Sequence, residues 1–176
     1  MKETYKSYLK EISAFIPRER IYTDEMRRLA WGTDASFYRL VPQIVVRSKT
    51  EEEVSRLLSA ARRRRLPVTF RAAGTSLSGQ SLSDSILIVA GKNWENYKIS
   101  ADAETITRQP GIIGERVNQL LKPFGRIFTP DPASKKAAMV GGLVVKTASG
   151  MSCGRLGDSA GQLGSESRLL PAGRLD

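Results

Sequence analysis

The chain contains no histidine and a single cysteine, Cys153, among its 176 residues. One thiol cannot form an internal disulfide, and a chain without histidine has neither the usual Cys/His zinc cage nor a His-based nucleophile pair. Imidazole is also excluded as a general base. Chemistry in this protein therefore requires a bound cofactor, other residue types or a partner. We expect no metal site and identify no catalytic residue.

Long hydrophobic runs are absent as well. The longest wholly apolar run, Ile86–Ala90, is far below the roughly 20 residues that a membrane-spanning helix needs. The start, Met1–Thr4, lacks the apolar core of a signal peptide. Since 40% of the residues are hydrophobic, the chain has enough apolar material for a core. We expect a soluble cytoplasmic protein with no membrane span.

Positive charge dominates, with a formal net charge of +10 at pH 7. Such a field attracts nucleic acid, acidic membranes or anionic ligands. The densest cluster, Arg62–Arg65, ends a predicted helix, where cations meet the negative end of the helix dipole, and we interpret it as a solvated helix end. Nucleic-acid binding is an alternative that depends on charge alone, because no base-reading motif or aromatic stacking platform is evident.

Two short amphipathic helices are predicted near the start of the chain. The first covers Tyr5–Phe15, and Pro17 ends it. The second begins after Asp24, an acceptable N-cap, and stops at Gly32, with its inward face formed by Met26, Leu29 and Ala30.

From Gln43 onward, β-branched runs alternate with helices, which is typical of βαβ units. Strands are predicted at Ile44–Arg47, Pro67–Arg71, Ile86–Val89 and Thr105–Gln109. Thr50–Glu53 reads as a capping box that starts a helix ending near Arg64. A chain that returns through a helix to a neighbouring strand usually places it parallel to the first, so we expect strand 67–71 to run parallel to strand 44–47. A further helix carries Val117, Leu120 and Leu121 on its apolar side.

The loop Arg71–Gln80 lies between two predicted strands and has the composition needed to hold a diphosphate. Glycines and small residues allow close backbone approach, and successive N–H groups can form an anion-binding nest. Thr75, Ser76 and Ser78 add hydroxyl donors. The loop has neither a P-loop ending nor a Gly-x-Gly-x-x-Gly turn. A plain surface turn is the alternative interpretation.

Three stretches resemble the FAD-binding domain of the vanillyl-alcohol oxidase type, also called PCMH-type, and especially its D-lactate dehydrogenase and glycolate oxidase branch. They are Arg71–Gln80, Pro130–Ser134, and Gly141–Gly142 followed by Ala148–Gly154. Trp31–Tyr38 and Pro42–Glu53 are similar to the family's opening segment. The resemblance covers most of the chain.

The resemblance implies an α/β (α+β) fold, the two-subdomain PCMH-type FAD-binding fold, incomplete at its C-terminus. Residues 1–42 would be a helical lead-in and residues 43–176 the incomplete FAD-binding domain, with the small subdomain at about Gln43–Ile99. The substrate domain, in which the family keeps its histidine-bearing catalytic residues, would be absent.

The resemblance also implies FAD as the cofactor. The pyrophosphate would be held by Arg71, Ala73, Gly74, Thr75, Ser76, Leu77, Ser78, Gly79 and Gln80. The ribityl and isoalloxazine portions would be held by Pro130, Asp131, Ser134, Gly141, Gly142, Thr147, Ala148, Ser149 and Gly150, with Gly141–Gly142 as a turn. Binding would be noncovalent, because relatives that attach FAD covalently use histidine and this chain has none.

The chain departs from the family pattern after Gly142. It reads Leu143–Thr147 where the branch usually has small apolar residues and two asparagines, and Lys146 brings size and charge near the expected ring edge. Asp158–Gln162 stands where an asparagine-serine-tyrosine step is usual, and Pro171 is poorly suited to a central strand.

The function implied is the FAD-binding part of a flavin-dependent oxidoreductase that oxidises a 2-hydroxy acid, of the D-lactate or glycolate type, to a 2-keto acid. The chain is expected to be inactive alone and to need additional sequence that carries the substrate domain, either covalently attached or as a separate polypeptide. The alternative is a non-catalytic relic or interaction module derived from an FAD domain.

Overall fold

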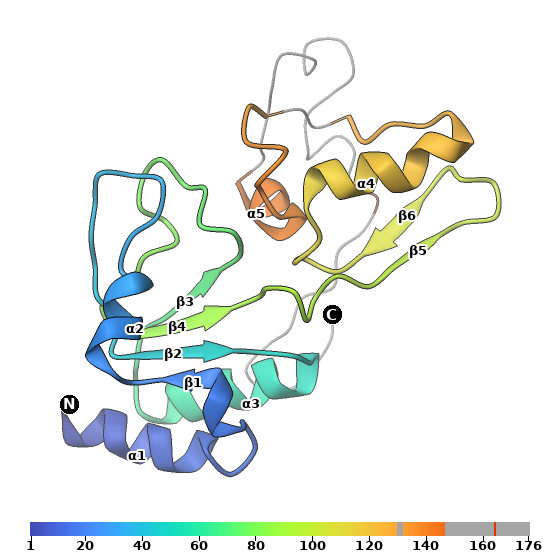
Figure 1. Ribbon diagram of the computed structural model, residues 1–176. Helices are drawn as coiled ribbons and strands as arrows, with labels where there is room; N and C mark the ends of the chain where they lie inside the picture. The colour runs from blue at the N-terminus through green and yellow to red at the C-terminus, as the bar shows by residue number, and fades with distance from the viewer. Residues whose placement is uncertain (130–131, 147–163, 165–176) are drawn as a thin grey trace. The chain divides into compact units, whose positions relative to one another are not determined.

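The computed structural model describes residues 1–129, 132–146 and 164 (Figure 1). They form two compact units, of which the first spans Met1–Ala90 and the second begins at Gly91. Within the described residues, no helix is both long enough and apolar enough to cross a membrane.

The first unit combines helices with one sheet. Its elements are α1 (Glu3–Ile12), the 3-10 helix η1 (Arg18–Arg20), β1 (Ile21–Tyr22), α2 (Glu25–Ala30), β2 (Ile44–Arg47), α3 (Glu51–Arg63), β3 (Val68–Arg71) and β4 (Ile86–Val89). The predicted strands 44–47 and 86–89 are confirmed at both ends, and strand 67–71 is confirmed from Val68.

The sheet of the first unit has the strand order β1-β2-β4-β3. β1 is antiparallel to β2, whereas β2, β4 and β3 run parallel. The expected parallel orientation of β3 and β2 is confirmed, but the two strands are not adjacent, because β4 lies between them and pairs Ile86 with both Ile44 and Val68. All four side chains of β4 are buried, which suits a central parallel strand, while Phe70 of the edge strand β3 is half exposed.

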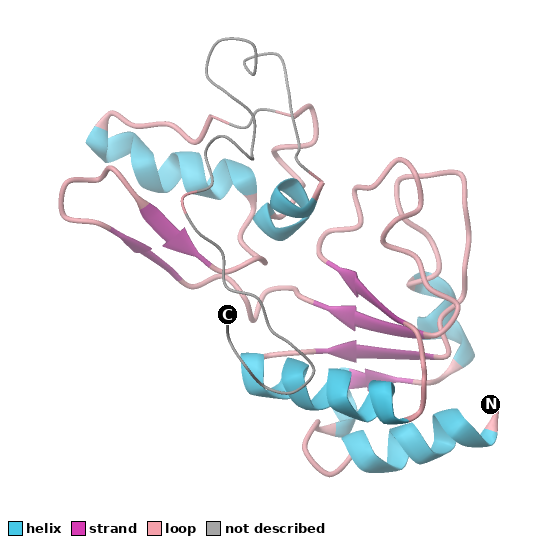
Figure 2. Cartoon of the chain, turned by 180° about the vertical axis from the view of Figure 1, so that it is seen from behind, coloured by secondary structure: helices cyan, strands magenta, loops and turns pink. Residues whose placement is uncertain are grey.

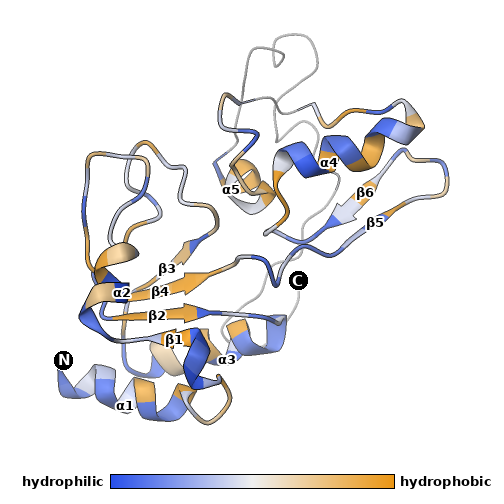
Figure 3. Ribbon diagram, viewed as in Figure 1, coloured by the Kyte–Doolittle hydropathy of each residue, from blue (hydrophilic) through white to orange (hydrophobic). Residues whose placement is uncertain are grey.

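The core lies on both faces of this sheet because successive side chains of a strand point to opposite sides. On one face α1 and α3 cover the sheet (Figure 2), and the buried side chains there include Tyr8, Ile12, Ile44, Val46, Leu57, Ile86 and Ile88. On the other face Val45, Leu87 and Val89 pack with Tyr22 and Trp31. Figure 3 shows β4 as a continuous apolar strand.

The capping box at the start of α3 is confirmed. The backbone N–H of Glu53 donates to Oγ1 of Thr50 at 3.1 Å, and Oε2 of Glu53 accepts from the N–H of Lys49 at 2.7 Å. The same carboxylate accepts two hydrogen bonds from the Arg20 guanidinium, at 2.8 and 2.7 Å. α3 is therefore attached to η1 as well as capped.

The arginine run at the end of α3 is less solvated than we predicted. Arg64 forms an ion pair with Glu11 of α1 at 2.8 Å, and only 18% of its side chain is exposed. Its guanidinium also donates to the carbonyl oxygen of Ser7 at 3.3 Å, and Arg63 pairs with the same Glu11 carboxylate. Two of the four arginines therefore connect α1 with α3, a role that helix periodicity alone does not reveal.

α2 begins as predicted but presents a different face. Oδ1 of Asp24 accepts from the backbone N–H of Arg27 at 3.0 Å, which confirms the N-cap. The predicted inward face is wrong, since Met26 is 82% and Leu29 45% exposed. Arg28 is anchored instead, with Nε donating to the carbonyl oxygen of Pro42 at 2.5 Å. A helix of six residues has too few apolar positions for periodicity to fix its orientation.

The second unit contains a hairpin and two helices. Its elements are β5 (Tyr97–Ile99), β6 (Ile106–Arg108), α4 (Gly114–Leu121), the 3-10 helix η2 (Lys122–Phe124) and α5 (Val140–Val145). β5 and β6 pair antiparallel, and β6 confirms the centre of the predicted strand 105–109. The core of this unit is formed by Ile112, Val117, Leu121, Phe128, Ala138, Val140 and Leu143.

The interpretation of Gly141–Gly142 as a turn is wrong, because both residues lie inside α5. The helix places Val140 and Leu143 in the core, three residues apart on one side. Gly141 lies so close to Pro110 that a Cβ atom at residue 141 would be 2.6 Å from the Pro110 Cβ. This glycine is therefore needed for close packing, which outweighs its low helix propensity.

Candidate functional site

The loop between β3 and β4 is irregular, as the sequence predicts. Gly74 and Gly79 both have a φ of 73°, in the left-handed region that favours glycine. At Gly74 the space is also limited, because a Cβ atom would lie 2.6 Å from Cζ of Arg71. The loop therefore curls back over the Arg71 guanidinium, and residue 74 must be glycine for both reasons.

Ser76 is the internal support of this loop, and only 3% of the residue is exposed. Its hydroxyl accepts from the backbone N–H groups of Ser78 and Gln80, at 3.2 and 3.3 Å, and donates to Oε1 of Gln80. The hydroxyl predicted as a ligand donor is thus used within the loop. Thr75 is partly buried and Ser78 is exposed.

Several backbone N–H groups of the loop have no acceptor within the described part of the chain. Among the described residues, the N–H groups of residues 73–77 and of Gly79 make no hydrogen bond. Consecutive N–H groups around a glycine with positive φ form a concave donor surface for an anion. The first unit therefore presents a set of donors of the kind that binds phosphate oxygens.

The Arg71 side chain makes its hydrogen bonds to backbone carbonyl oxygens of residues 31 and 33. Its Nη1 donates to the carbonyl oxygens of Thr33 and Trp31, at 2.7 and 3.3 Å. The guanidinium carbon also lies 5.2 Å from the centre of the Trp31 ring. Burial lowers the pKa of Arg71, and the charge of Asp34 partly offsets this effect. The side chain connects the end of β3 to the segment at residues 31–33.

Asp34 contacts the other end of the loop. Its Oδ2 accepts from the Ser81 hydroxyl at 2.9 Å, and its Oδ1 accepts from the backbone N–H and hydroxyl of Ser36 at 2.9 and 2.5 Å. Partial burial alone would raise the pKa of Asp34, but these hydrogen bonds and the charge of Arg71 outweigh burial and lower it. The carboxylate therefore remains ionised at neutral pH.

Two further contacts join the same segments, which lie side by side in Figures 1 and 2. The N–H of Ala35 donates to the carbonyl oxygen of Gly74 at 3.1 Å. Tyr38 lies against Gly79, where a Cβ atom would be 3.1 Å from its Cδ2. An open hollow of about 310 Å³ next to this contact is lined by Tyr38, Arg39, Leu40, Ser78, Gly79 and Leu82.

In the second unit the structure places three of the predicted site residues. The carbonyl oxygen of Ser134 accepts from the N–H groups of Ala137 and Ala138, at 2.8 and 2.7 Å. Gly141 is packed on Pro110, whereas a Cβ atom at Gly142 would have no atom of the described residues within 4 Å. Gly142 is therefore the glycine of this pair that remains accessible to a ligand. Six predicted residues lie outside the described part of the chain, namely Pro130, Asp131, Thr147, Ala148, Ser149 and Gly150.

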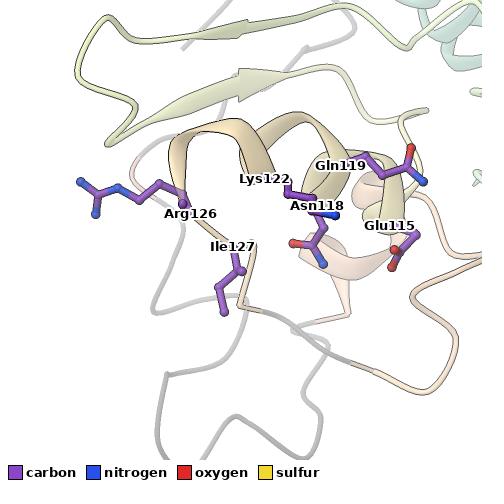
Figure 4. Close-up of a pocket in the computed structure, with 7 residues that line it drawn as sticks. Glu115, Asn118, Gln119, Lys122, Arg126 and Ile127 are labelled. Carbon is purple, nitrogen blue, oxygen red and sulfur yellow. The ribbon is translucent and has the colours of Figure 1, made fainter.

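A larger surface hollow, of about 470 Å³, lies on α4 and the residues after it (Figure 4). Sequence reasoning did not select it, because its lining residues form no motif. It is lined by Glu115, Asn118, Gln119, Lys122, Gly125, Arg126 and Ile127. Oδ1 of Asn118 accepts from the backbone N–H of Phe128 at 2.7 Å and so holds the following segment. Charges of both signs line this open hollow, and we assign it no function.

Comparison with known proteins identifies the family. A family described as "FAD binding domain" matches residues 42–175. The glycolate oxidase subunit GlcD of Escherichia coli K12 is 34% identical over 142 residues, which are 79% of this chain and 28% of that protein. The D-2-hydroxyglutarate dehydrogenase of Pseudomonas putida is 30% identical over 150 residues, 83% of this chain and 15% of that protein. The chain thus spans less than a third of either relative.

Solved structures show the same fold. An alkyldihydroxyacetonephosphate synthase superposes with a TM-score of 0.84 at 20% identity, covering 96% of this chain and 34% of that one. The Physcomitrella patens BBE-like 1 protein superposes with a TM-score of 0.81 at 17% identity, covering 95% and 37%. The mixed helix and strand fold of the PCMH type, predicted from the sequence, is confirmed. The family match over residues 42–175 shows that this chain belongs to the FAD binding domain family.

Proposed function

We propose that this chain binds FAD noncovalently and is the cofactor-binding part of a flavin-dependent oxidoreductase acting on a 2-hydroxy acid. The main support is the β3–β4 loop, whose N–H groups at residues 73–77 and Gly79 have no acceptor among the described residues. Donors fixed around two glycines suit a diphosphate, which carries several acceptor oxygens. The net charge of +10 adds a field that attracts this anion.

The loop residues Ala73–Gln80 would hold the pyrophosphate mainly through their backbone. Arg71 lies at the start of this loop, and its guanidinium lies next to Gly74. The remaining portions of FAD would contact Pro130, Asp131, Ser134, Gly141, Gly142, Thr147, Ala148, Ser149 and Gly150. The noncovalent mode is proposed because the sequence lacks the histidine used for covalent attachment in relatives of this type.

A 2-hydroxy acid is the proposed substrate class because two relatives are named for such acids, glycolate and D-2-hydroxyglutarate. When bound, FAD supplies the two-electron acceptor for the oxidation to a 2-keto acid. This chain would bind and orient the cofactor. The group that takes the substrate proton would belong to a substrate domain, for which we propose additional sequence, either covalently attached or in a separate partner polypeptide.

Titration of the purified chain with FAD, FMN and riboflavin, followed by flavin fluorescence, tests cofactor binding. We expect FAD to bind more tightly than FMN, and ADP to compete with FAD, because the loop recognises the diphosphate. Equal affinities for FAD and FMN would contradict the proposed use of the loop. No binding of any flavin would favour the alternative of a non-catalytic module.

A further inference from the structure

The segment at residues 31–38 lies before the family match, which begins at residue 42. It nevertheless contacts the β3–β4 loop near both ends. At the start of the loop, Thr33 and Trp31 accept from Arg71, and Ala35 donates to Gly74. These contacts lie next to the N–H groups that have no acceptor within the described chain.

At the far end of the loop the same segment makes two more contacts. Asp34 accepts from Ser81, and Tyr38 lies against Gly79. Asp34 also accepts twice from Ser36, which fixes its carboxylate in place. The loop is therefore fixed at Arg71, Gly74, Gly79 and Ser81, while residues 75–78 between these points are supported by Ser76.

These contacts hold the loop in one conformation, which favours anion binding. N–H groups that converge on an anion site carry partial positive charges that repel one another, and in the ligand-free protein no anion offsets this repulsion. A free loop would relax so that these N–H groups diverge. A loop held in its binding conformation avoids the entropy cost of ordering when the anion arrives.

We propose that residues 31–38 form a positioning element for the β3–β4 loop, in which Arg71 and Asp34 are positioning residues and do not contact the cofactor phosphates. The proposal depends on the proposed function, since it concerns the same loop. It gives Arg71 a different task from a phosphate ligand, because its Nη1 already donates to two carbonyl oxygens.

The test uses the variants Arg71→Gln and Asp34→Asn, with Arg20→Gln as the matched control. The control breaks an arginine–carboxylate pair of the first unit that includes no residue of the loop, that of Arg20 with Glu53. The first measurement is hydrogen–deuterium exchange in the ligand-free chain at the backbone N–H groups that are hydrogen-bonded to the loop or within it, those of Ala35, Ser78 and Gln80. The second is the affinity for FAD and for riboflavin, which lacks phosphate.

We expect exchange at these three N–H groups to accelerate in Arg71→Gln and Asp34→Asn but not in Arg20→Gln. FAD affinity should fall about tenfold in the two loop variants, as expected for loss of hydrogen bonds to a charged group, while riboflavin affinity stays unchanged. Arg71→Lys retains a cationic donor and should recover part of the FAD affinity. If Arg71→Gln fails to fold, Arg71→Lys and Asp34→Asn carry the same test.

The outcomes separate this proposal from the proposed function. Reduced FAD affinity with unchanged exchange would overturn the proposal and make Arg71 a direct phosphate ligand. Unchanged exchange and unchanged FAD affinity would also overturn it. Faster exchange in the loop variants of a chain that binds no FAD would support the positioning role and overturn the proposed function.

Discussion

Arg20 and Glu53 form a two-point hydrogen-bonded ion pair, at 2.8 and 2.7 Å, in which only 13% and 15% of the side chains are exposed. The pair connects η1 to the first turn of α3. Burial alone would raise the pKa of Glu53, but the hydrogen bonds from Arg20 and Lys49 outweigh it and lower that pKa. The same pair raises the pKa of Arg20.

Replacing Glu53 by Gln should reduce the free energy of unfolding by about 2–3 kcal/mol at pH 7, because Arg20 then loses its charged partner. A lowered folded-state pKa means that the ionised carboxylate stabilises the fold above its unfolded pKa of about 4.3. This contribution disappears as the pH falls through the folded-state value. The free energies of unfolding of the two proteins, measured with urea between pH 7 and pH 3, should therefore approach each other as the pH falls. A constant difference across that range would contradict the pair's role.

Gly141→Ala should destabilise the second unit by about 1–3 kcal/mol, because the added Cβ would overlap the Pro110 ring. Gly142→Ala is the matched control, since a Cβ atom at that position of the same helix would contact no atom of the described residues. Alanine is the better helix former, so this variant should be as stable as the parent or up to about 1 kcal/mol more stable. Thermal unfolding of both variants measures this difference in stability. Equal losses of stability would show that the Pro110 contact is unimportant.

Gly74→Ala should greatly weaken FAD binding, because alanine is strained at a φ of 73° and its Cβ would displace the Arg71 guanidinium. Gly125→Ala is the control, as Gly125 has a φ of 65° but open space around it. Both variants should lose about 1–2 kcal/mol of stability from backbone strain. Only Gly74→Ala should change the FAD dissociation constant in a fluorescence titration, and similar FAD affinities in both would argue against the loop as the binding site.

The chain alone should not oxidise 2-hydroxy acids, even with added FAD and an artificial electron acceptor. Turnover requires a bound substrate carboxylate and a group that accepts the hydroxyl proton, and positioning alone can account for about 7–11 kcal/mol of a barrier. The chain has no histidine for the second task. Dye reduction with D-lactate, glycolate and a longer 2-hydroxy acid, compared with a boiled sample, measures this. Saturable, stereospecific turnover above free FAD would contradict the expectation.

The sequence by itself determined the features that depend on neighbouring residues. Thr50 and Asp24 cap their helices as predicted, because a cap needs only the N–H groups of the next turn. Ile44–Arg47 and Ile86–Val89 are strands because β-branched, apolar runs of this length suit buried sheet positions. The glycines, small residues and hydroxyl residues of 71–80 likewise predict a loop from the sequence alone.

Tertiary structure decided what depends on residues far apart in the chain. The insertion of β4 between β2 and β3 follows from pairing on both sides, and the helical Gly141 follows from the space that Pro110 leaves. Local patterns likewise did not show that Arg71 turns toward Thr33 or that Arg64 pairs with Glu11, over separations of 38 and 53 residues. Such contacts depend on how the segments pack in space, and a periodicity of two or 3.6 residues carries no information about that packing.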